Sequence, residues 1–213
     1  MDHTRHQEKS SEVRRGSTVS KPLEEWAAFL TLGCVAWGTS FLWIKIGLQE
    51  VGPFMLVAMR LTFGTLGIWV ILILFKVPMP RSRTEISAGA LLGLCNTAIP
   101  FTLIAWGETK ITSGLTGILN ATTPLLTIVI AHLFLSDQRI TPSKLLGLMF
   151  GFAGIVLLFS HDIVLYGLSG NIWAQIAIIC ASISYAVSAV YTRRVLGGQH
   201  PITLAAISLT GAM

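Results

Sequence analysis

Beyond the first 22 residues, long apolar runs alternate with short polar segments along the chain. Most of the runs reach the ~20 residues that an α-helix needs to cross the hydrocarbon core of a bilayer. Because they are continuous and do not alternate every second residue, they favour helices over strands. The pattern predicts six full membrane-spanning helices and part of a seventh, over Trp26–Gly47, Pro53–Phe75, Ile86–Trp106, Thr112–Leu135, Leu145–Phe159, Ile172–Tyr191 and from Pro201 onward.

Composition and charge agree with a polytopic all-α membrane protein. Apolar residues make up 53% of the chain and charged residues 12%, whereas soluble domains carry about 25% charged residues. Of the 15 Lys and Arg residues, 12 fall on the side of the predicted helices that also holds the polar tail of residues 1–22. This bias predicts a multi-pass protein of the plasma membrane, the inner membrane in a bacterium, with a flexible N-terminal tail in the cytoplasm.

The same distribution argues against several partners and activities. The net charge of +5 comes from basic residues in the tail and at helix ends, so no nucleic-acid partner is expected. The three cysteines lie apart within apolar runs, and neither a disulfide framework, a metal site nor a cofactor is expected. Motifs for nucleotide binding, zinc peptidases and serine hydrolases are absent from the sequence, which argues against an enzyme.

The first and sixth spans resemble each other weakly. When Trp37 is placed on Tyr185, Pro53 falls on Pro201, and in both copies an apolar helix ends in a cation before a short loop. The two copies lie an odd number of spans apart, so they would cross the membrane in opposite directions. Inverted repeats of this kind are common in secondary transporters; chance similarity between apolar helices is the alternative.

A polar stripe follows the predicted fourth span. Its members are spaced three and four residues apart, which places them on one helix face; they are Ser113, Thr116, Asn120, Thr123 and Thr127. Pro124 lies within the stripe and is predicted to kink the helix and free a backbone carbonyl. The stripe is interpreted as the wall of a solute cavity, with hydrogen bonding between packed helices as the alternative.

Other spans carry similar groups. The third span has Asn96 and Pro100, the first has Trp37 and Ser40, and the sixth has Tyr185 beside two serines. Aromatic rings next to small polar groups suit a pocket for a small organic molecule. The candidate substrate-binding residues are therefore Trp37, Ser40, Asn96, Asn120, Thr123, Pro124 and Tyr185.

Few ionisable groups lie within the spans. Lys45 is expected to extend to the outer interface. Arg60 either does the same or pairs with Glu108 or an anionic substrate. Glu108 is expected in a loop, with a cation or proton site at the outer gate as the alternative, so Arg60 and Glu108 are candidate gating residues. Glycines at four-residue spacing, in pairs beginning at Gly89 and Gly147, are assigned to helix packing.

Two stretches of the sequence resemble those of a known family. ILNATTPLLTIVIAHLFLSDQRITPSKLLGLMFGFAGIVLLF (118–159) and WGTSFLWIKIGL (37–48), followed by Pro53 and Arg60, resemble the EamA domain of the drug/metabolite transporter superfamily. The resemblance implies one five-span repeat over residues 26–160 and the truncated start of a second over 171–213. It also implies that the chain is a fragment of a ten-span bundle of two inverted repeats with a central cavity.

A function follows from this resemblance. Members of the superfamily export or exchange amino acids, metabolites or drugs, so the sequence predicts a secondary transporter, or permease, for a small organic solute in the lipid bilayer. The alternatives are a membrane-embedded scaffold subunit and an enzyme that acts on lipid-linked substrates. A homodimer is compatible with the sequence.

Overall fold

The computed structural model describes residues 23–79, 82–135, 141–158, 160 and 171–213. The tail of residues 1–22 and the charged loop of residues 136–140 lie outside the described residues. Every regular element in the described part is a helix. The elements are α2 (Leu23–Gly38), α3 (Ser40–Gly47), α4 (Pro53–Leu74), α5 (Arg83–Gly93), η1 (Leu94–Ala98, a π-helical turn), α6 (Ile99–Glu108), α7 (Ser113–Asn120), α8 (Thr123–Phe134), α9 (Pro142–Leu158), α11 (Ile172–Val195) and α12 (Pro201–Gly211).

The helices confirm a polytopic all-α membrane protein. Within the described residues, five helical segments are long and apolar enough to span a bilayer. They are Trp26–Gly47, Pro53–Leu74, Arg83–Glu108, Ser113–Phe134 and Ile172–Val195. Each overlaps a span predicted from the apolar pattern. The third span is longer than predicted at both ends, because Arg83 and Glu108 are helical.

The fifth predicted span corresponds to α9. Its described part has 17 residues, which extend about 25 Å at 1.5 Å per residue. A typical hydrocarbon core is about 30 Å thick.

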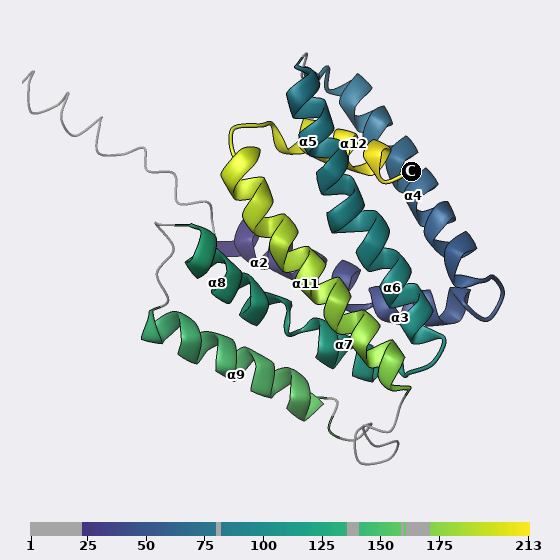
Figure 1. Cartoon of the computed structure of the whole chain (residues 1–213), viewed down its shortest axis with the longest axis vertical. Coiled ribbons are helices and arrows are strands. Elements are labelled where there is room, and N and C mark those ends of the chain that lie inside the picture. Colours follow the sequence, from purple (N-terminus) through teal and green to yellow (C-terminus); the bar gives the residue numbers. More distant parts are fainter. Residues whose placement is uncertain (1–22, 80–81, 136–140, 159, 161–170) are drawn as a thin grey trace, which may run out of the picture. The chain divides into compact units, whose positions relative to one another are not determined.

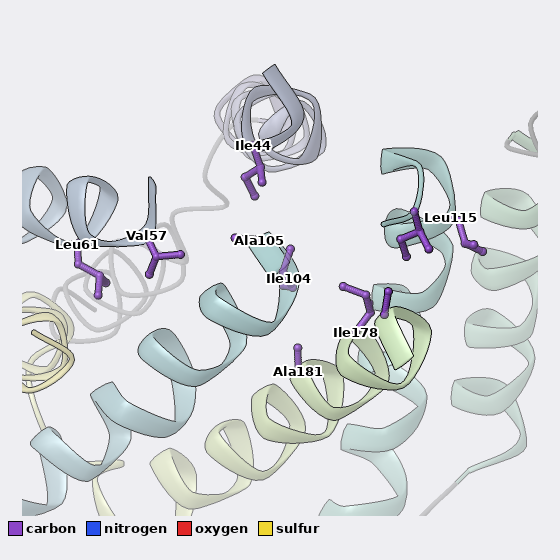
Figure 2. Close-up of a cluster of buried hydrophobic side chains, with 10 residues drawn as sticks. Ile44, Val57, Leu61, Ile104, Ala105, Leu115, Ile178 and Ala181 are labelled. Atoms are coloured by element: carbon purple, nitrogen blue, oxygen red, sulfur yellow. The ribbon is translucent and has the colours of Figure 1, made fainter. Parts of the chain in front are cut away.

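The chain divides into two compact units, Met1–Ser40 and Phe41–Met213, which are described separately. In the first unit, α2 exposes large apolar side chains, including Leu30 and Leu32. In the second unit, α11 packs along α6, α7 and α8 (Figure 1). The core of the second unit draws buried side chains from α3, α4, α6, α7 and α11; Figure 2 labels Ile44, Val57, Leu61, Ile104, Ala105, Leu115, Ile178 and Ala181.

Glycine brings α6 and α11 together at this core. A Cβ atom on Gly107 would lie 2.7 Å from Cδ1 of Ile178 and 3.4 Å from the carbonyl oxygen of Ala174. The hydrogen side chain of Gly107 therefore allows α11 to cover the C-terminal end of α6. The residue that follows, Glu108, is fully buried.

The predicted packing role of Gly89 and Gly93 is confirmed. Helix α12 packs against the face of α5 that carries them. A Cβ on Gly89 would lie 2.6 Å from Cγ2 of Ile207, and one on Gly93 would lie 1.8 Å from the carbonyl oxygen of Ser208. From α12, Gly211 approaches α5 just as closely.

The second glycine pattern behaves differently. A Cβ atom on Gly147, Gly151 or Gly154 of α9 would meet nothing within 4 Å. The packing role predicted for these glycines is thus not realised within the described part of the chain. Sequence spacing alone does not distinguish a glycine face that has a partner helix from one that lacks it.

Candidate functional site

The third span is interrupted halfway along its length. Pro100 has no N–H to donate, and the turn before it, η1, is a π-helix. The N–H of Ile99 reaches the carbonyl of Leu94, five residues back, instead of the carbonyl of Cys95. The carbonyl of Cys95 accepts a hydrogen bond from the hydroxyl of Ser184 on α11. A π turn often occurs at a functional position in a helix, and here it carries half-buried Asn96.

The fourth span is also interrupted, and the predicted kink at Pro124 is confirmed. Helix α7 ends at Asn120, a turn follows, and α8 begins at Thr123 with Pro124 in its first turn. The hydroxyl of Thr123 donates to the carbonyl of Asn120 at 2.7 Å. From α11, the hydroxyl of Ser182 lies 3.5 Å from the carbonyl oxygen of Leu119 and 3.4 Å from Oδ1 of Asn120.

Helix α11 contacts both interruptions. It packs against η1, α7 and α8, and its hydroxyls bond to acceptors at both interruptions: Ser184 to the carbonyl of Cys95, and Ser182 to the carbonyl of Leu119 and to Oδ1 of Asn120. Half-buried Tyr185 lies on the same helix. The structure therefore gathers the segments that bear Asn96, Asn120, Thr123 and Tyr185 around one helix, whereas Pro124 itself is exposed.

The bond between Ser182 and Asn120 bears on the interpretation of the polar stripe. It links two helices, which is the packing role that the sequence left open as an alternative. Asn96 and Thr123 are half-buried, and the described contacts of Thr123 are to its own helix terminus. Hydrogen bonding between helices therefore accounts for part of the stripe only.

Ser184 was not among the residues predicted from the sequence. It stands two residues after Ser182, which places it on a different face of α11 from the face that bears Ser182 and Tyr185. Its partner is the carbonyl of Cys95, which is available only because the third span contains a π turn. A proline within a long apolar helix, Pro100, is the sequence signal that could have indicated this contact.

Two of the predicted substrate residues, Trp37 and Ser40, belong to the first unit. Their proposed contact with a solute stays a prediction. Trp37 lies near the end of α2 and Ser40 at the start of α3, on either side of a one-residue interruption at Thr39.

The sequence predicted that Glu108 lies in a loop, and this prediction is wrong. Glu108 is the last residue of α6, and its side chain is 0% exposed. Both carboxyl oxygens are buried and have no hydrogen-bond partner in the described structure. The polar residues that follow Glu108 suggested a loop, but α6 continues to Glu108, where Lys45 of α3 and Arg60 of α4 lie close enough for electrostatic interactions with its carboxyl group.

Lys45 contacts the C-terminal end of α6, and its expected extension to the outer interface stays a prediction. Its ammonium group donates to the backbone carbonyl of Glu108, and to that of Ile111 at 3.0 Å. A cation near the C-terminus of a helix stabilises the carbonyls that have no partner within the helix. Lys45 thus binds the end of α6 from α3, and its charge lies close enough to the Glu108 carboxyl for an electrostatic interaction.

Arg60 lies deeper, on α4. Its guanidinium carbon is 4.6 Å from the centre of the Phe101 ring, which is a cation–π contact. Arg60 also interacts electrostatically with Glu108 and with Tyr185. The structure thus brings Arg60 into the neighbourhood of Glu108, which is one of the alternatives that the sequence left open for it.

A spanning helix with a π turn and another with a break, each with polar side chains at the irregular position, are features of the kind found in membrane transporters. Residues 25–160 match the EamA-like transporter family. The chain belongs to this family, as the resemblance in its sequence implied.

Individual relatives agree with this assignment. The chain is 32% identical over 162 residues to the uncharacterized inner membrane transporter YedA of Escherichia coli strain K12, an alignment that covers 76% of this chain and 51% of YedA. It is 28% identical over 133 residues to a probable terminal-alkyne amino-acid exporter of Streptantibioticus cattleyicolor, covering 62% of this chain and 43% of that protein. The chain thus spans about half the length of these curated relatives. No solved structure matches it with comparable significance.

Proposed function

We propose that this chain forms part of a permease that moves a small organic metabolite, amino acid or drug across the plasma membrane. The observation that carries the proposal is the meeting of two interrupted spans on one helix, α11. Broken helices expose backbone carbonyls and N–H groups that bind polar solutes near the middle of the bilayer. Membership of the EamA-like transporter family supports a transport role over an enzymatic one.

The solute path in this proposal follows the polar groups at the breaks. Asn96 and Thr123 offer an amide and a hydroxyl that are half-buried, and Tyr185 offers an aromatic ring that interacts with Arg60. Asn120 contributes its amide, and Pro124 contributes by breaking the helix. Trp37 and Ser40, in the first unit, stay candidate solute residues on the basis of the sequence alone.

The proposed direction is export or exchange. The relative named as an amino-acid exporter supports export of a solute that carries amino and carboxyl groups. Arg60 provides a cation to meet a carboxylate, and the amide and hydroxyl oxygens accept hydrogen bonds from an ammonium group. Zwitterionic amino acids are therefore the first solutes to test.

The domain organisation in this proposal is that of an inverted repeat. Residues 26–160 form the first five-span repeat, and 171–213 begin a second one that crosses the membrane in the opposite direction. Transport then occurs by rocking one repeat against the other around the broken helices. The N-terminus lies in the cytoplasm, as the distribution of Lys and Arg predicts.

The test is solute exchange in vesicles that contain the protein at its full natural length. A panel of radiolabelled neutral amino acids is loaded inside the vesicles, and exchange with external solute is measured. Thr123→Val keeps the shape of the side chain and removes the hydroxyl, so we expect at least a tenfold loss of exchange. Thr62→Val is the matched control, because the hydroxyl of Thr62 also bonds its own helix, to the carbonyl of Ala58 at 2.8 Å.

The outcomes distinguish the two roles considered for the polar stripe, which are binding of the solute and hydrogen bonding that supports the helices. Loss of exchange in Thr123→Val, with normal folding and a normal control, supports a solute path along α8. Equal exchange in both variants would remove Thr123 from the path. Equal loss in both variants would indicate that these hydroxyls support the helices and not the solute.

A further inference from the structure

The carboxyl group of Glu108 is enclosed in a way that the solute path does not explain. The side chain is 0% exposed, and neither oxygen has a hydrogen-bond partner in the described structure. Burial of a carboxylate costs several kcal/mol unless charges and hydrogen bonds compensate. The nearest ammonium group, on Lys45, directs two donors at backbone carbonyls. The carboxyl group is thus buried without the hydrogen bonds that normally hold an ionised acid.

Two cations lie near Glu108, each on a neighbouring helix. Lys45 approaches from α3 and Arg60 from α4, and both interact electrostatically with the carboxyl group. Tyr185 on α11 interacts with Arg60. A small shift of either cation therefore changes the charge around a carboxyl group that has no hydrogen-bond partner in the described structure.

The size of the enclosed site restricts what can bind there. A fully buried side chain leaves no surface for an organic solute. A metal ion requires several protein ligands, and the described residues contain no group of three or more His, Cys, Asp or Glu residues that could hold one. A proton requires only the carboxyl oxygen itself.

We propose that Glu108 is a proton-binding site and that release of its proton is coupled to movement of the solute. The coupling part rests on the proposed transport function; the proton site does not. In the closed arrangement the carboxyl group carries the proton and packs between α6 and α11. When the end of α6 opens, the proton passes to water, and the carboxylate pairs with the ammonium group of Lys45 or the guanidinium of Arg60.

The helix that carries Glu108 also provides the connection to the solute path. Helix α6 begins directly after the π turn that bears Asn96 and ends at Glu108. Its ten residues cover about 15 Å. Because α6 packs along α11, a shift at the Glu108 end moves both helices that meet at the breaks.

The proton site is tested by infrared spectroscopy on the full chain in lipid nanodiscs, without any solute. A protonated carboxyl group has a C=O band that is separate from that of a carboxylate. We expect such a band at acidic pH, its loss as the pH is raised, and its absence in Glu108→Gln. Glu50→Gln is the matched control, because Glu50 is exposed, and it should leave the band unchanged. A band that is missing in the wild type, insensitive to pH, or retained in Glu108→Gln would overturn the proton site.

Coupling is tested by imposing a pH gradient on vesicles that contain the full-length protein. The probe is a radiolabelled neutral amino acid that the wild-type protein exchanges. We expect the gradient to drive accumulation several-fold above the level without a gradient, and Glu108→Gln to abolish that gain. Accumulation that does not change with the gradient, or a gain that persists in Glu108→Gln, would overturn the proposed coupling between proton release and solute movement. Absence of exchange for the whole panel would instead count against the proposed transport function, and the infrared result would still decide the proton site.

Discussion

The contact between α5 and α12 gives the sharpest quantitative test of the structure. A methyl group added at Gly93 would lie 1.8 Å from the carbonyl oxygen of Ser208, 2.7 Å from its carbonyl carbon and 3.1 Å from the backbone nitrogen of Ala212. These are backbone atoms of a helix, so they cannot move aside as the end of a side chain can. The Ser208 carbonyl also accepts a hydrogen bond from the N–H of Ala212 at 3.0 Å.

The expected cost follows from the shift that the methyl group imposes. Ordinary van der Waals contact begins near 3.4 Å, so α12 must move away from α5 by about 1.6 Å. Overpacking of this kind costs about 1–3 kcal/mol. We expect Gly93→Ala to lower the free energy of unfolding of the full chain by about that amount.

The assay is unfolding by SDS in mixed micelles, followed by circular dichroism. Gly67→Ala is the matched control, because its Cβ would meet nothing within 4 Å and alanine is favoured over glycine in a helix by up to about 1 kcal/mol. The two substitutions should therefore change stability in opposite directions. Equal stability of the two variants would refute the close approach of α5 and α12.

Three further substitutions test contacts of the buried charged cluster and the π turn. Lys45→Met removes the donor to two backbone carbonyls at the end of α6 and should cost about 1.5–3 kcal/mol per hydrogen bond to the charged group. Phe101→Leu removes the ring beneath Arg60 and should cost about 0.5–2 kcal/mol. Ser184→Ala leaves the carbonyl of Cys95 without its donor and should cost about 1 kcal/mol. The same SDS titration measures all three, and a free energy of unfolding equal to that of the wild type would refute the contact concerned.

The fold was largely predictable because bilayer thickness dictates the length of an apolar run. The spans that begin at Pro53 and Ile172 were predicted with their correct first residues. The break at Pro124 was predictable as well, since proline removes a helical hydrogen bond wherever it stands. These features depend on local sequence, and local sequence was sufficient.

The contacts of the charged residues were not predictable, because they depend on segments that are distant in sequence. The surroundings of Glu108 include Lys45 and Arg60, which lie on helices distant in sequence. The acceptors of Lys45 are carbonyls at and just beyond the end of α6. Neither set of neighbours is visible in the run of residues around the charged group itself.

The π turn at Leu94–Ala98 has a consequence for the register of the third span. A π turn holds one more residue than an α turn, and one residue corresponds to about 100° of rotation around a helix. The faces of α5 and α6 are therefore out of phase by that angle. Removal of a single residue from this turn would straighten the span. It would also rotate Phe101 away from Arg60 and Glu108 away from α11. The arrangement of the whole buried cluster therefore depends on the one additional residue of the π turn.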